Sequence, residues 1–421
     1  TWLKHLTCCA KEFERTAARL MPMMLQPRAP LLFMILLACL RTVFAATDPW
    51  PTMLQDAAHS GLLGQGLELP SKAPQIKWKH RAQGAVESSV VLSDTRVFSA
   101  AGNHIFALDK SSGEKVWSFE AKSQVLASGT LGDGLYMIGT DDHHFYALKQ
   151  DTGELVWKFK GGEFTGGAVV GKEADGPVVY VGSGANKLHA YWLNGSKRFN
   201  FKASGNVAST PALDWTSVFF GDDSGTFYRL NRSSGKLVWK AQFESNIRSP
   251  PRVHQDGIFI SIGDPDEKQS GEVVHLDYDG NVKWRATCGR ESSSKCGSCW
   301  TSPAVIDHLN VVVAGCGLDN KKEGTVWGLL KDTGEVKWSF DAENDCQTSS
   351  PVIVGRDAVI IGCTDGKLYA LRAADGKLLW KFTAKKGIWA TPALDHDGTI
   401  FIGSHDGYVY ALSGSNIKHE F

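Results

Sequence analysis

One short block of residues recurs along the chain, about every 40 residues, and it constrains the fold more than any other feature. Each copy has an aromatic-Ala-Leu run or a close variant, a polar turn that ends in Gly, and an aromatic residue four positions after that Gly. In one copy the run at 145–148 leads to Gly153 and then to Trp157. Self-similarity at such a period is typical of solenoids and propellers.

Each copy predicts a β-hairpin. Alternating apolar residues before the turn indicate a strand, and Gly accepts the positive φ of a hairpin corner. Two shorter strands precede each copy, one small and often containing Pro, as at 210–212, and one strongly apolar that ends in Gly, as at 218–221. Four strands in about 40 residues are the pattern of a propeller blade.

The aromatic position occurs eight times when Phe199 is counted as a substitute for Trp: Trp78, Trp117, Trp157, Phe199, Trp239, Trp284, Trp338 and Trp380. The first Trp has no inner strands before it, and the last hairpin strand, at 409–412, has no outer strand after it. Both gaps close if the N-terminal strand completes the last blade, which also removes exposed sheet edges. We therefore predict an all-β fold, one eight-bladed β-propeller of four-stranded antiparallel blades. Seven blades is the alternative, if the degenerate copy at 188–201 is not a full blade.

The expected domain organisation follows from these limits. The propeller covers residues 75–413, preceded by a targeting segment at 1–46 and a lead-in at 47–74, and followed by a tail at 414–421. Because Thr1 is not an initiator, we expect part of the targeting segment to be an extension of the gene model.

The targeting segment has the pattern of a secretory signal. Arg28 precedes an apolar run at 31–40, and small residues follow at 45–46. The run is far shorter than the about 20 residues that span a bilayer. The alternatives are an uncleaved anchor and a lipid anchor on Cys39, which ends a stretch similar to a bacterial lipobox. We expect a protein of the secretory pathway, extracellular or in the ER lumen, with a lipid-anchored bacterial periplasmic protein as the alternative.

Composition excludes two classes of protein, a disordered chain and a binder of nucleic acid. Hydrophobic residues make up 43% of the chain, which is ample material for a core and excludes a disordered protein. The 45 basic and 45 acidic residues cancel, so no net positive field favours nucleic acid.

Six cysteines follow the targeting segment, and an even number behind a signal peptide predicts disulfides: Cys288, Cys296, Cys299, Cys316, Cys346 and Cys363. Cys299 and Cys346 stand just before inner strands, and Cys316 and Cys363 end the second strands beside them. We therefore expect the pairs Cys299–Cys316 and Cys346–Cys363, with Cys288 and Cys296 closing a long loop. A metal site at the CxxC of 296–299 and free or redox thiols are the alternatives.

Loop growth is concentrated in blades 5 and 6, at 263–271, 285–300 and 316–324. Since strands alternate in direction, these loops share one face of the propeller, and loops on a rigid scaffold are where binding usually resides. We expect the partner-binding face of blades 5 to 7 to include Asp264, Asp266, Glu267, Arg290, Lys295, Lys321 and Lys322.

The repeated block, together with the stretch Trp-Pro-Thr-Met at 50–53, resembles the pyrroloquinoline-quinone-like (PQQ-like) β-propeller repeat family over residues 50–413. The resemblance implies the propeller fold. It implies two possible functions, because the family contains quinoprotein dehydrogenases that hold PQQ and calcium, and cofactor-free scaffolds such as the bacterial outer-membrane assembly lipoprotein. Fold alone does not decide between them.

The chain departs from the dehydrogenases of this family. Their adjacent cysteines have a counterpart only in Cys8 and Cys9, outside the propeller, and most loops here are short. Trp300 and Trp389, near the channel end of inner strands, would be the residues that stack on PQQ, although core packing is the simpler interpretation. We expect a non-catalytic module that binds an unidentified protein, without cofactor, metal ion, nucleic acid or a membrane span in the mature chain. A PQQ-dependent oxidoreductase similar to alcohol dehydrogenases, with calcium, is the alternative.

Overall fold

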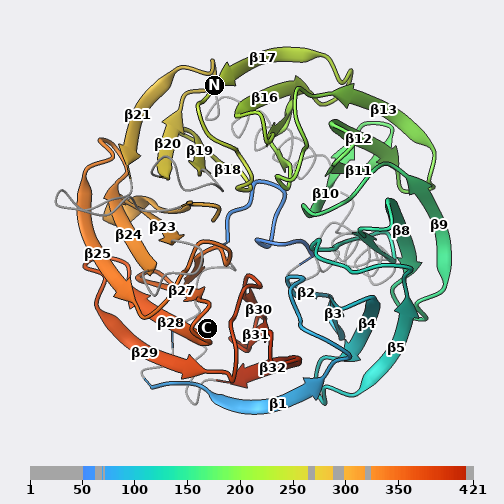
Figure 1. Cartoon of the computed structure of the whole chain (residues 1–421), viewed down its shortest axis with the longest axis horizontal. Helices are drawn as coiled ribbons and strands as arrows, with labels where there is room; N and C mark the ends of the chain where they lie inside the picture. Colours follow the sequence, from blue (N-terminus) through green and yellow to red (C-terminus); the bar gives the residue numbers. More distant parts are fainter. Residues whose placement is uncertain are drawn as a thin grey trace, which may run out of the picture. The chain divides into compact units, whose positions relative to one another are not determined.

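The computed structural model describes residues 51–61, 69, 72–263, 271–287, 298–317 and 324–413. These residues form eight four-stranded antiparallel sheets arranged as the blades of a ring (Figure 1). The predicted eight-bladed propeller is confirmed. The alternative of seven blades is wrong, because the copy that carries Phe199 forms a complete four-stranded sheet.

In blades 1 to 7 the four strands follow one another outward from the ring axis in chain order. Blades 1 and 2 contain β2 (Val91–Leu92), β3 (Arg96–Ala101), β4 (His104–Asp109), β5 (Lys115–Glu120), β6 (Thr130–Gly132), β7 (Leu135–Gly139), β8 (His144–Lys149) and β9 (Leu155–Lys160). Blades 3 and 4 contain β10 (Ala168–Glu173), β11 (Gly176–Ser183), β12 (Lys187–Trp192), β13 (Lys197–Lys202), β14 (Ala212–Leu213), β15 (Ser217–Gly221), β16 (Thr226–Asn231) and β17 (Leu237–Gln242).

The second half of the ring repeats this plan. Blades 5 and 6 contain β18 (Arg252–His254), β19 (Gly257–Ile262), β20 (Glu272–Leu276), β21 (Val282–Thr287), β22 (Ala304–Ile306), the short 3-10 helix η2 (Asp307–Leu309), β23 (Val311–Gly317), β24 (Gly324–Leu330) and β25 (Val336–Ala342). Blade 7 contains β26 (Val352–Val354), β27 (Ala358–Gly362), β28 (Lys367–Arg372) and β29 (Leu378–Thr383). Blade 8 contains β30 (Ala393–Leu394), β31 (Ile400–Gly403) and β32 (Tyr408–Ser413), with β1 (Gln75–Arg81) as its outer strand.

The ring is closed by the N-terminal strand, as predicted. Strand β1 pairs antiparallel with β32, with Lys79 opposite Tyr410, so blade 8 combines the two ends of the propeller. This closure leaves the last blade with four strands like its neighbours, and it pairs the edge that β32 would otherwise expose.

The repeated Gly and Trp form one contact between neighbouring blades. The Trp117 ring on the outer strand of blade 1 covers Gly153 in the hairpin turn of blade 2, where a Cβ atom would lie 2.6 Å from the indole. Gly153 also has φ of +72°, which a side chain would strain. The indole Nε1 donates a hydrogen bond of 2.7 Å to the carbonyl of Gln150 in the same turn. The regular spacing of Gly and Trp in the sequence therefore reflects a packing contact that is repeated between neighbouring blades.

A belt of hydroxyl groups joins the inner strands. The backbone N–H of Ser302 donates to Ser350 Oγ at 2.9 Å, and Ser350 in turn donates its N–H to Thr391 Oγ1 at 3.1 Å. The belt continues from Thr391 N–H to Ser89 Oγ, and from Ser89 N–H to Ser128 Oγ. All of these hydroxyl groups are buried, so the bonds satisfy backbone donors that would otherwise be costly to bury. Small hydroxyl residues of the inner strands, three of them followed by Pro, therefore connect blades 6, 7, 8, 1 and 2.

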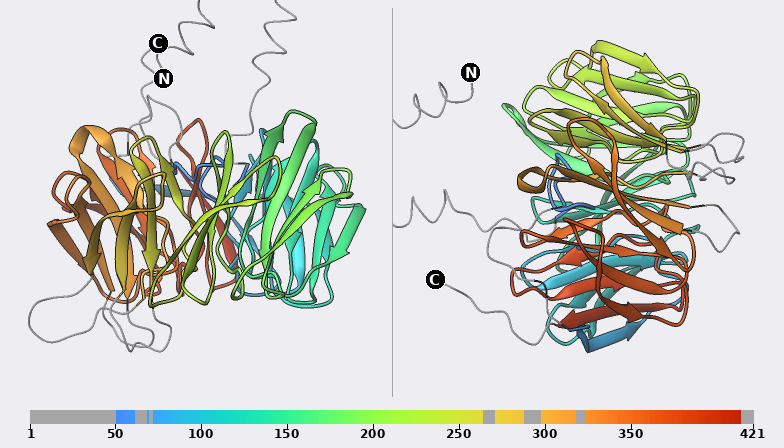
Figure 2. Two further views of the ribbon diagram at one scale, coloured as in Figure 1. Left: turned by 90° about the horizontal axis from the view of Figure 1, so that it is seen from above. Right: turned by 90° about the vertical axis from the view of Figure 1, so that its left-hand side faces the viewer.

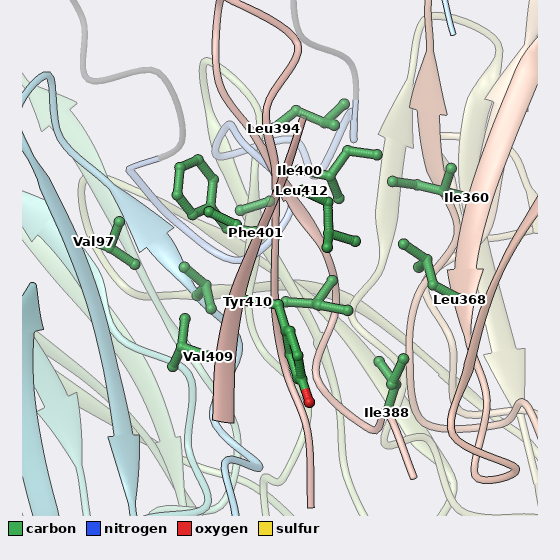
Figure 3. Packing of buried hydrophobic residues seen from close by; sticks show 14 of the residues in the cluster. Val97, Ile360, Leu368, Ile388, Leu394, Ile400, Phe401, Val409, Tyr410 and Leu412 are labelled. Atoms are coloured by element: carbon green, nitrogen blue, oxygen red, sulfur yellow. The ribbon is translucent and has the colours of Figure 1, made fainter. Parts of the chain in front are cut away.

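The hydrophobic core lies between blades (Figure 3). Around blade 8, the buried Phe401 and Tyr410 belong to one cluster with Val97 of blade 1 and Ile360 of blade 7. Each blade is therefore stabilised mainly by its neighbours, as expected for repeats that cannot bury their own faces alone.

The lead-in crosses the ring axis, which the sequence did not predict. Residues 51–61, here called the plug segment, appear as the blue chain at the centre of Figure 1. Their carbonyl oxygens accept hydrogen bonds from the inner-strand N–H groups of Leu131, Leu213, Val253 and Ile353. The plug segment thereby contacts blades 2, 4, 5 and 7 at the ends of their inner strands. We call this end of the ring, seen from the side in Figure 2, the plug end.

Candidate binding face

The opposite end of the ring, here called the loop face, carries the connections that enter inner strands and the turns between second and third strands. These two kinds of loop contact each other: the N–H groups of Ala121 and Val125 donate to the carbonyls of Asn103 and Gly102. The predicted sharing of one face by these loops thus follows from the observed topology. The loop-face residues Asp264, Asp266, Glu267, Arg290, Lys295, Lys321 and Lys322 lie outside the described residues, and their binding role stays a prediction.

Two disulfides hold the loop face in blades 6 and 7. Cys299 is bonded to Cys316 and Cys346 to Cys363, each pair 17 residues apart in sequence, which matches the expected pairing. All four cysteines are buried, with exposed fractions of 1% or less. They are therefore structural links and not accessible thiols. Cys288 and Cys296 lie outside the described residues.

Eight equivalent residues stand at the loop-face end of the inner strands, shortly before the hydroxyl belt. We call them the collar, and their side chains vary between blades: Glu87, Leu126, Thr165, Ala208, Arg248, Trp300, Thr348 and Trp389. The preceding position is apolar in most blades and packs over a glycine of the previous blade, as Val207 does over Gly182. The collar residues do not pack over a glycine in this way. Their side chains can therefore differ from one blade to another.

In blades 4 to 6, the positive charge of the collar residue Arg248 is neutralised by a neighbouring carboxylate. The Arg248 guanidinium binds the Asp223 carboxylate through two hydrogen bonds of 2.8 and 3.1 Å. Its Cζ lies 5.4 Å from the centre of the Trp300 ring, within the range of a cation–π contact. Asn206 donates a further bond of 3.1 Å to Asp223. The Trp300 ring, the Arg248 guanidinium and the Asp223 carboxylate therefore form one connected cluster.

On the side of blades 8 to 2, the collar lacks such a cation. Trp389 is 39% exposed, and its ring lies against His405 with a centroid distance of 4.0 Å. Glu87 Oε1 lies 3.6 Å from Nε2 of His405. Core packing was the simpler interpretation of Trp389 from the sequence. It is wrong, because the loop that carries Trp389 leaves part of the indole exposed to solvent.

Negative charge gathers around Glu87 on the loop face. Burial and the neighbouring Asp141 raise the pKa of Glu87, and burial and the neighbouring Glu163 raise the pKa of Asp141. One carboxylate oxygen of Asp141 is buried without a hydrogen-bond partner among the described residues. Burial and Lys386 lower the pKa of His405, so the imidazole adds no compensating charge near neutral pH. The carboxylates of Glu87, Asp141 and Glu163 thus act on one another across the loop face of blades 1 to 3, with His143 as a partly compensating neighbour of Asp141.

A match to a known family decides what kind of propeller this is. Residues 72–200, 163–251, 194–266 and 261–418 match the model of the family described as outer membrane protein assembly factor BamB. The chain belongs to this family. The PQQ-like resemblance found in the repeats is thereby confirmed.

Individual relatives are distant. The chain is 27% identical to BamB of Yersinia pestis over 218 residues, which are 48% of this chain and 51% of that protein. It is 24% identical to tetrathionate hydrolase of Acidithiobacillus ferrooxidans over 197 residues, 44% of this chain and 38% of that protein. The chain spans about half the length of the curated relatives it matches.

Solved structures share the fold. BamB of Moraxella catarrhalis superposes with a TM-score of 0.65 at 17% identity, covering 82% of this chain and 99% of that chain. Quinohemoprotein alcohol dehydrogenase of Comamonas testosteroni superposes with a TM-score of 0.71 at 15% identity, covering 89% of this chain and 82% of that chain. Both likenesses concern the propeller fold alone.

The sequence-based candidates for PQQ stacking, Trp300 and Trp389, have different surroundings. The one guanidinium of the collar, that of Arg248, lies over the Trp300 ring and is already bound to the Asp223 carboxylate. The Trp389 ring has His405 against it and is 39% exposed. Binding of PQQ by either residue stays an alternative prediction.

A possible metal site also fails on its contacts. Among the described residues, His254, Asp256 and Asp307 at the plug end form the one group whose ligand atoms could share a metal ion. The Lys331 ammonium, however, binds both carboxylates, with a distance of 2.8 Å to Asp307. A lysine cation thus already neutralises this group, and His254 bonds to Asp307 as a link between blades 5 and 6.

Over the described residues, no helix has the length and apolar character needed to cross a membrane. The two disulfides are typical of an oxidising compartment.

Proposed function

We propose that this chain is a non-catalytic scaffold of the secretory pathway that binds a protein partner through its loop face. The observation that carries the proposal is the difference between the two ends of the ring. The plug segment covers the plug end, whereas the loop face presents the exposed Trp389 against His405, which in turn contacts the Glu87 carboxylate. Exposed aromatic residues next to charged groups are typical of protein-binding surfaces.

The names of the relatives support this function without assigning a partner. Several matched proteins are named as outer membrane protein assembly factors, a role that consists of association with other proteins. The disulfides support a site in the secretory pathway or in a bacterial periplasm, since both are oxidising. We extend the binding face over blades 5 to 7 to the long loops that carry Lys321 and Lys322.

The test compares the two ends of the full chain in its native compartment. Lysine-reactive cross-linking followed by peptide mapping should join partner proteins to loop-face lysines, and the double change Lys321→Glu and Lys322→Glu should reduce those links. Trp215→Glu, at the 87% exposed turn residue of the plug end, is the matched control and should leave them unchanged. Links confined to the plug end would overturn the proposal. So would saturable PQQ binding with calcium-dependent oxidation of an alcohol.

A further inference from the structure

Two Asn-x-Ser triplets lie in neighbouring hairpin turns at the plug end. Residues 194–196 form the turn between the third and fourth strands of blade 3, and residues 231–233 begin the same turn of blade 4. Arg198, just after the first turn, donates a hydrogen bond of 3.1 Å to the Ser233 carbonyl in the second. Asn-x-Ser is the acceptor pattern for N-linked glycans, and because it also arises by chance, the accessibility of the Asn amide decides whether it can be used.

The side-chain oxygen of Asn231 organises its turn. It accepts hydrogen bonds of 2.8 Å from Ser233 Oγ and from Ser234 Oγ, and one of 2.9 Å from the Ser234 N–H. Asp109 has the equivalent position in blade 1, since the backbone hydrogen bonds of the two turns match. Its Oδ1 accepts from the N–H and hydroxyl groups of both serines of that turn. The turn therefore uses one side-chain oxygen at this position, which a carboxylate or an amide can supply.

The second polar atom of the side chain differs between the two blades. In blade 1, Asp109 Oδ2 accepts a hydrogen bond of 3.2 Å from the Arg96 guanidinium on the opposite strand. In blade 4 the residue opposite Asn231 is Ser217, whose hydroxyl is engaged by Arg229. The Asn231 Nδ2 donates no hydrogen bond among the described residues, and it is not one of their buried unpaired atoms, so it is accessible to solvent. The nitrogen that would accept a glycan is thus not used by the turn.

The middle residue of this triplet leaves the turn surface open. Arg232 is buried, and its guanidinium binds the Glu173 carboxylate and backbone carbonyls of blades 3 and 4. Its long side chain therefore lies inside the contact between these blades. The hydroxyl residues Ser233 and Ser234 are exposed beside Asn231.

The triplet of blade 3 has the same arrangement. Asn194 is exposed, and its Oδ1 accepts hydrogen bonds of 2.9 and 2.7 Å from the N–H and hydroxyl of Ser196. Its Nδ2 also donates no hydrogen bond among the described residues. By contrast, the exposed Asn281 in the corresponding turn of blade 5 donates its Nδ2 to Asp277 at 2.9 Å, and Lys283 stands where the triplets have Ser. In these turns the free amide nitrogen therefore coincides with the acceptor pattern.

We propose that Asn194 and Asn231 are N-glycosylation sites and that the plug-end rim of blades 3 and 4 carries the glycans. The proposal rests on the secretory-pathway location proposed above, where a lipid-linked oligosaccharide diphosphate serves as the donor. The Asn Nδ2 forms a bond to the anomeric carbon of the first sugar as the bond from that carbon to the diphosphate oxygen breaks. The amide loses one proton, the lipid diphosphate leaves, and both Oδ1 atoms keep their hydrogen bonds. Because these turns lie at the plug end, the glycans leave the loop face free for a partner.

The test uses the full chain recovered from its native compartment. Treatment with peptide-N-glycosidase F in H₂¹⁸O converts each glycosylated Asn into an Asp that carries ¹⁸O, and peptide mapping locates this label. We expect the label at Asn194 and Asn231. We expect none at the exposed Asn281, which controls for spontaneous deamidation.

Serine variants separate the glycan from the structure of the turn. Ser233→Ala and Ser234→Ala each remove one hydroxyl hydrogen bond of 2.8 Å to Asn231 Oδ1, but only Ser233 belongs to the triplet. We expect the label at Asn231 to be lost in Ser233→Ala, kept in Ser234→Ala and restored in Ser233→Thr. Ser196→Ala and Ser196→Thr are the corresponding pair for Asn194.

An unlabelled Asn194 or Asn231 in the native protein would overturn the assignment of that position. A label at Asn231 that survives Ser233→Ala, or an equal label at Asn281, would overturn it as well. If both triplets are unlabelled while the loop-face cross-links described above persist, the proposed binding function stands without the glycans. If the cross-links also fail, both are wrong.

Discussion

The two ends of the propeller differ in what covers the ends of the inner strands. At the plug end, residues 51–61 lie across the inner strands and bury Leu54 and His59, which are 1% and 2% exposed. At the loop face, no comparable segment of the described chain crosses the inner strands, and Trp389 remains 39% exposed. The protein thus fills one end with its own backbone and leaves aromatic and charged groups at the other. This difference indicates where a second molecule can bind.

The largest expected effect concerns the plug end. Leu54→Ala removes a fully buried side chain from the cluster it shares with Val352 and Phe401, so we expect a loss of about 2–5 kcal/mol in the free energy of unfolding. Chemical denaturation of the variant measures this loss. A loss below about 1 kcal/mol would mean that the plug segment is loosely attached and that the two ends are alike.

The disulfides of the loop face give the next effect. Replacing Cys346 and Cys363 by serine opens a link between residues 17 apart, for which we expect a loss of about 3 kcal/mol. The same denaturation experiment applies, with the reduced parent protein as the control. Equal stability of oxidised and reduced parent protein would show that these links do not stabilise the loop face.

The pH dependence of the plug end gives a smaller effect. Burial lowers the pKa of His59 to about 4, and its Nδ1 contacts the carbonyl of Pro251 at 2.9 Å. The unfolded chain therefore binds a proton at a pH where the folded chain does not, and stability falls as the pH drops from about 7 toward 4. His189 and His275, whose pKa values burial also lowers to about 4, add to the same trend.

The contribution of His59 can be separated by substitution. His59→Gln should flatten the loss of stability between about pH 7 and pH 5 by about 2 kcal/mol relative to the parent protein. Denaturation series at the two pH values measure the change. An unchanged slope would show that His59 is accessible to protons and that the plug segment does not seal this end.

The smallest effect on stability is expected where the effect on binding is greatest. Trp389→Ala should change the free energy of unfolding by about 0.5 kcal/mol or less, because the indole is exposed, yet it should weaken the partner cross-links of the loop face. Denaturation and cross-linking of one preparation measure both. A large loss of stability would assign Trp389 to the core and remove the contrast with Leu54.

The ring could be predicted from the sequence because the contacts between its blades repeat at a regular spacing along the chain. Each blade locks onto the next through a Trp over a Gly, so the contact repeats as a spacing, and Phe199 could be recognised because it keeps the place without the indole. The disulfides were predictable for a related reason, since strand order alone places Cys299 beside Cys316. Features shared by all blades leave a signal that a single sequence reveals.

The plug segment and the contacts of the collar were missed because neither repeats, although Trp300 and Trp389 themselves were singled out. Residues 51–61 form no strand in the structure, so alternation of apolar residues cannot mark them. The collar contacts join Arg248 to Asp223 and Glu87 to His405, residues of different blades. Arg248, Trp300 and Trp389 each stand three residues before a Pro of an inner strand, and this shared spacing was the available signal.

The most direct measurement is site-specific photo-cross-linking from the two ends of the full chain in its native compartment. A photoreactive residue at the exposed Lys386, on the loop that carries Trp389, is compared with one at the exposed Lys236, in a turn at the plug end. The account predicts a discrete protein adduct from position 386 and none from position 236. Adducts from position 236 alone, or equal adducts from both positions, would contradict it.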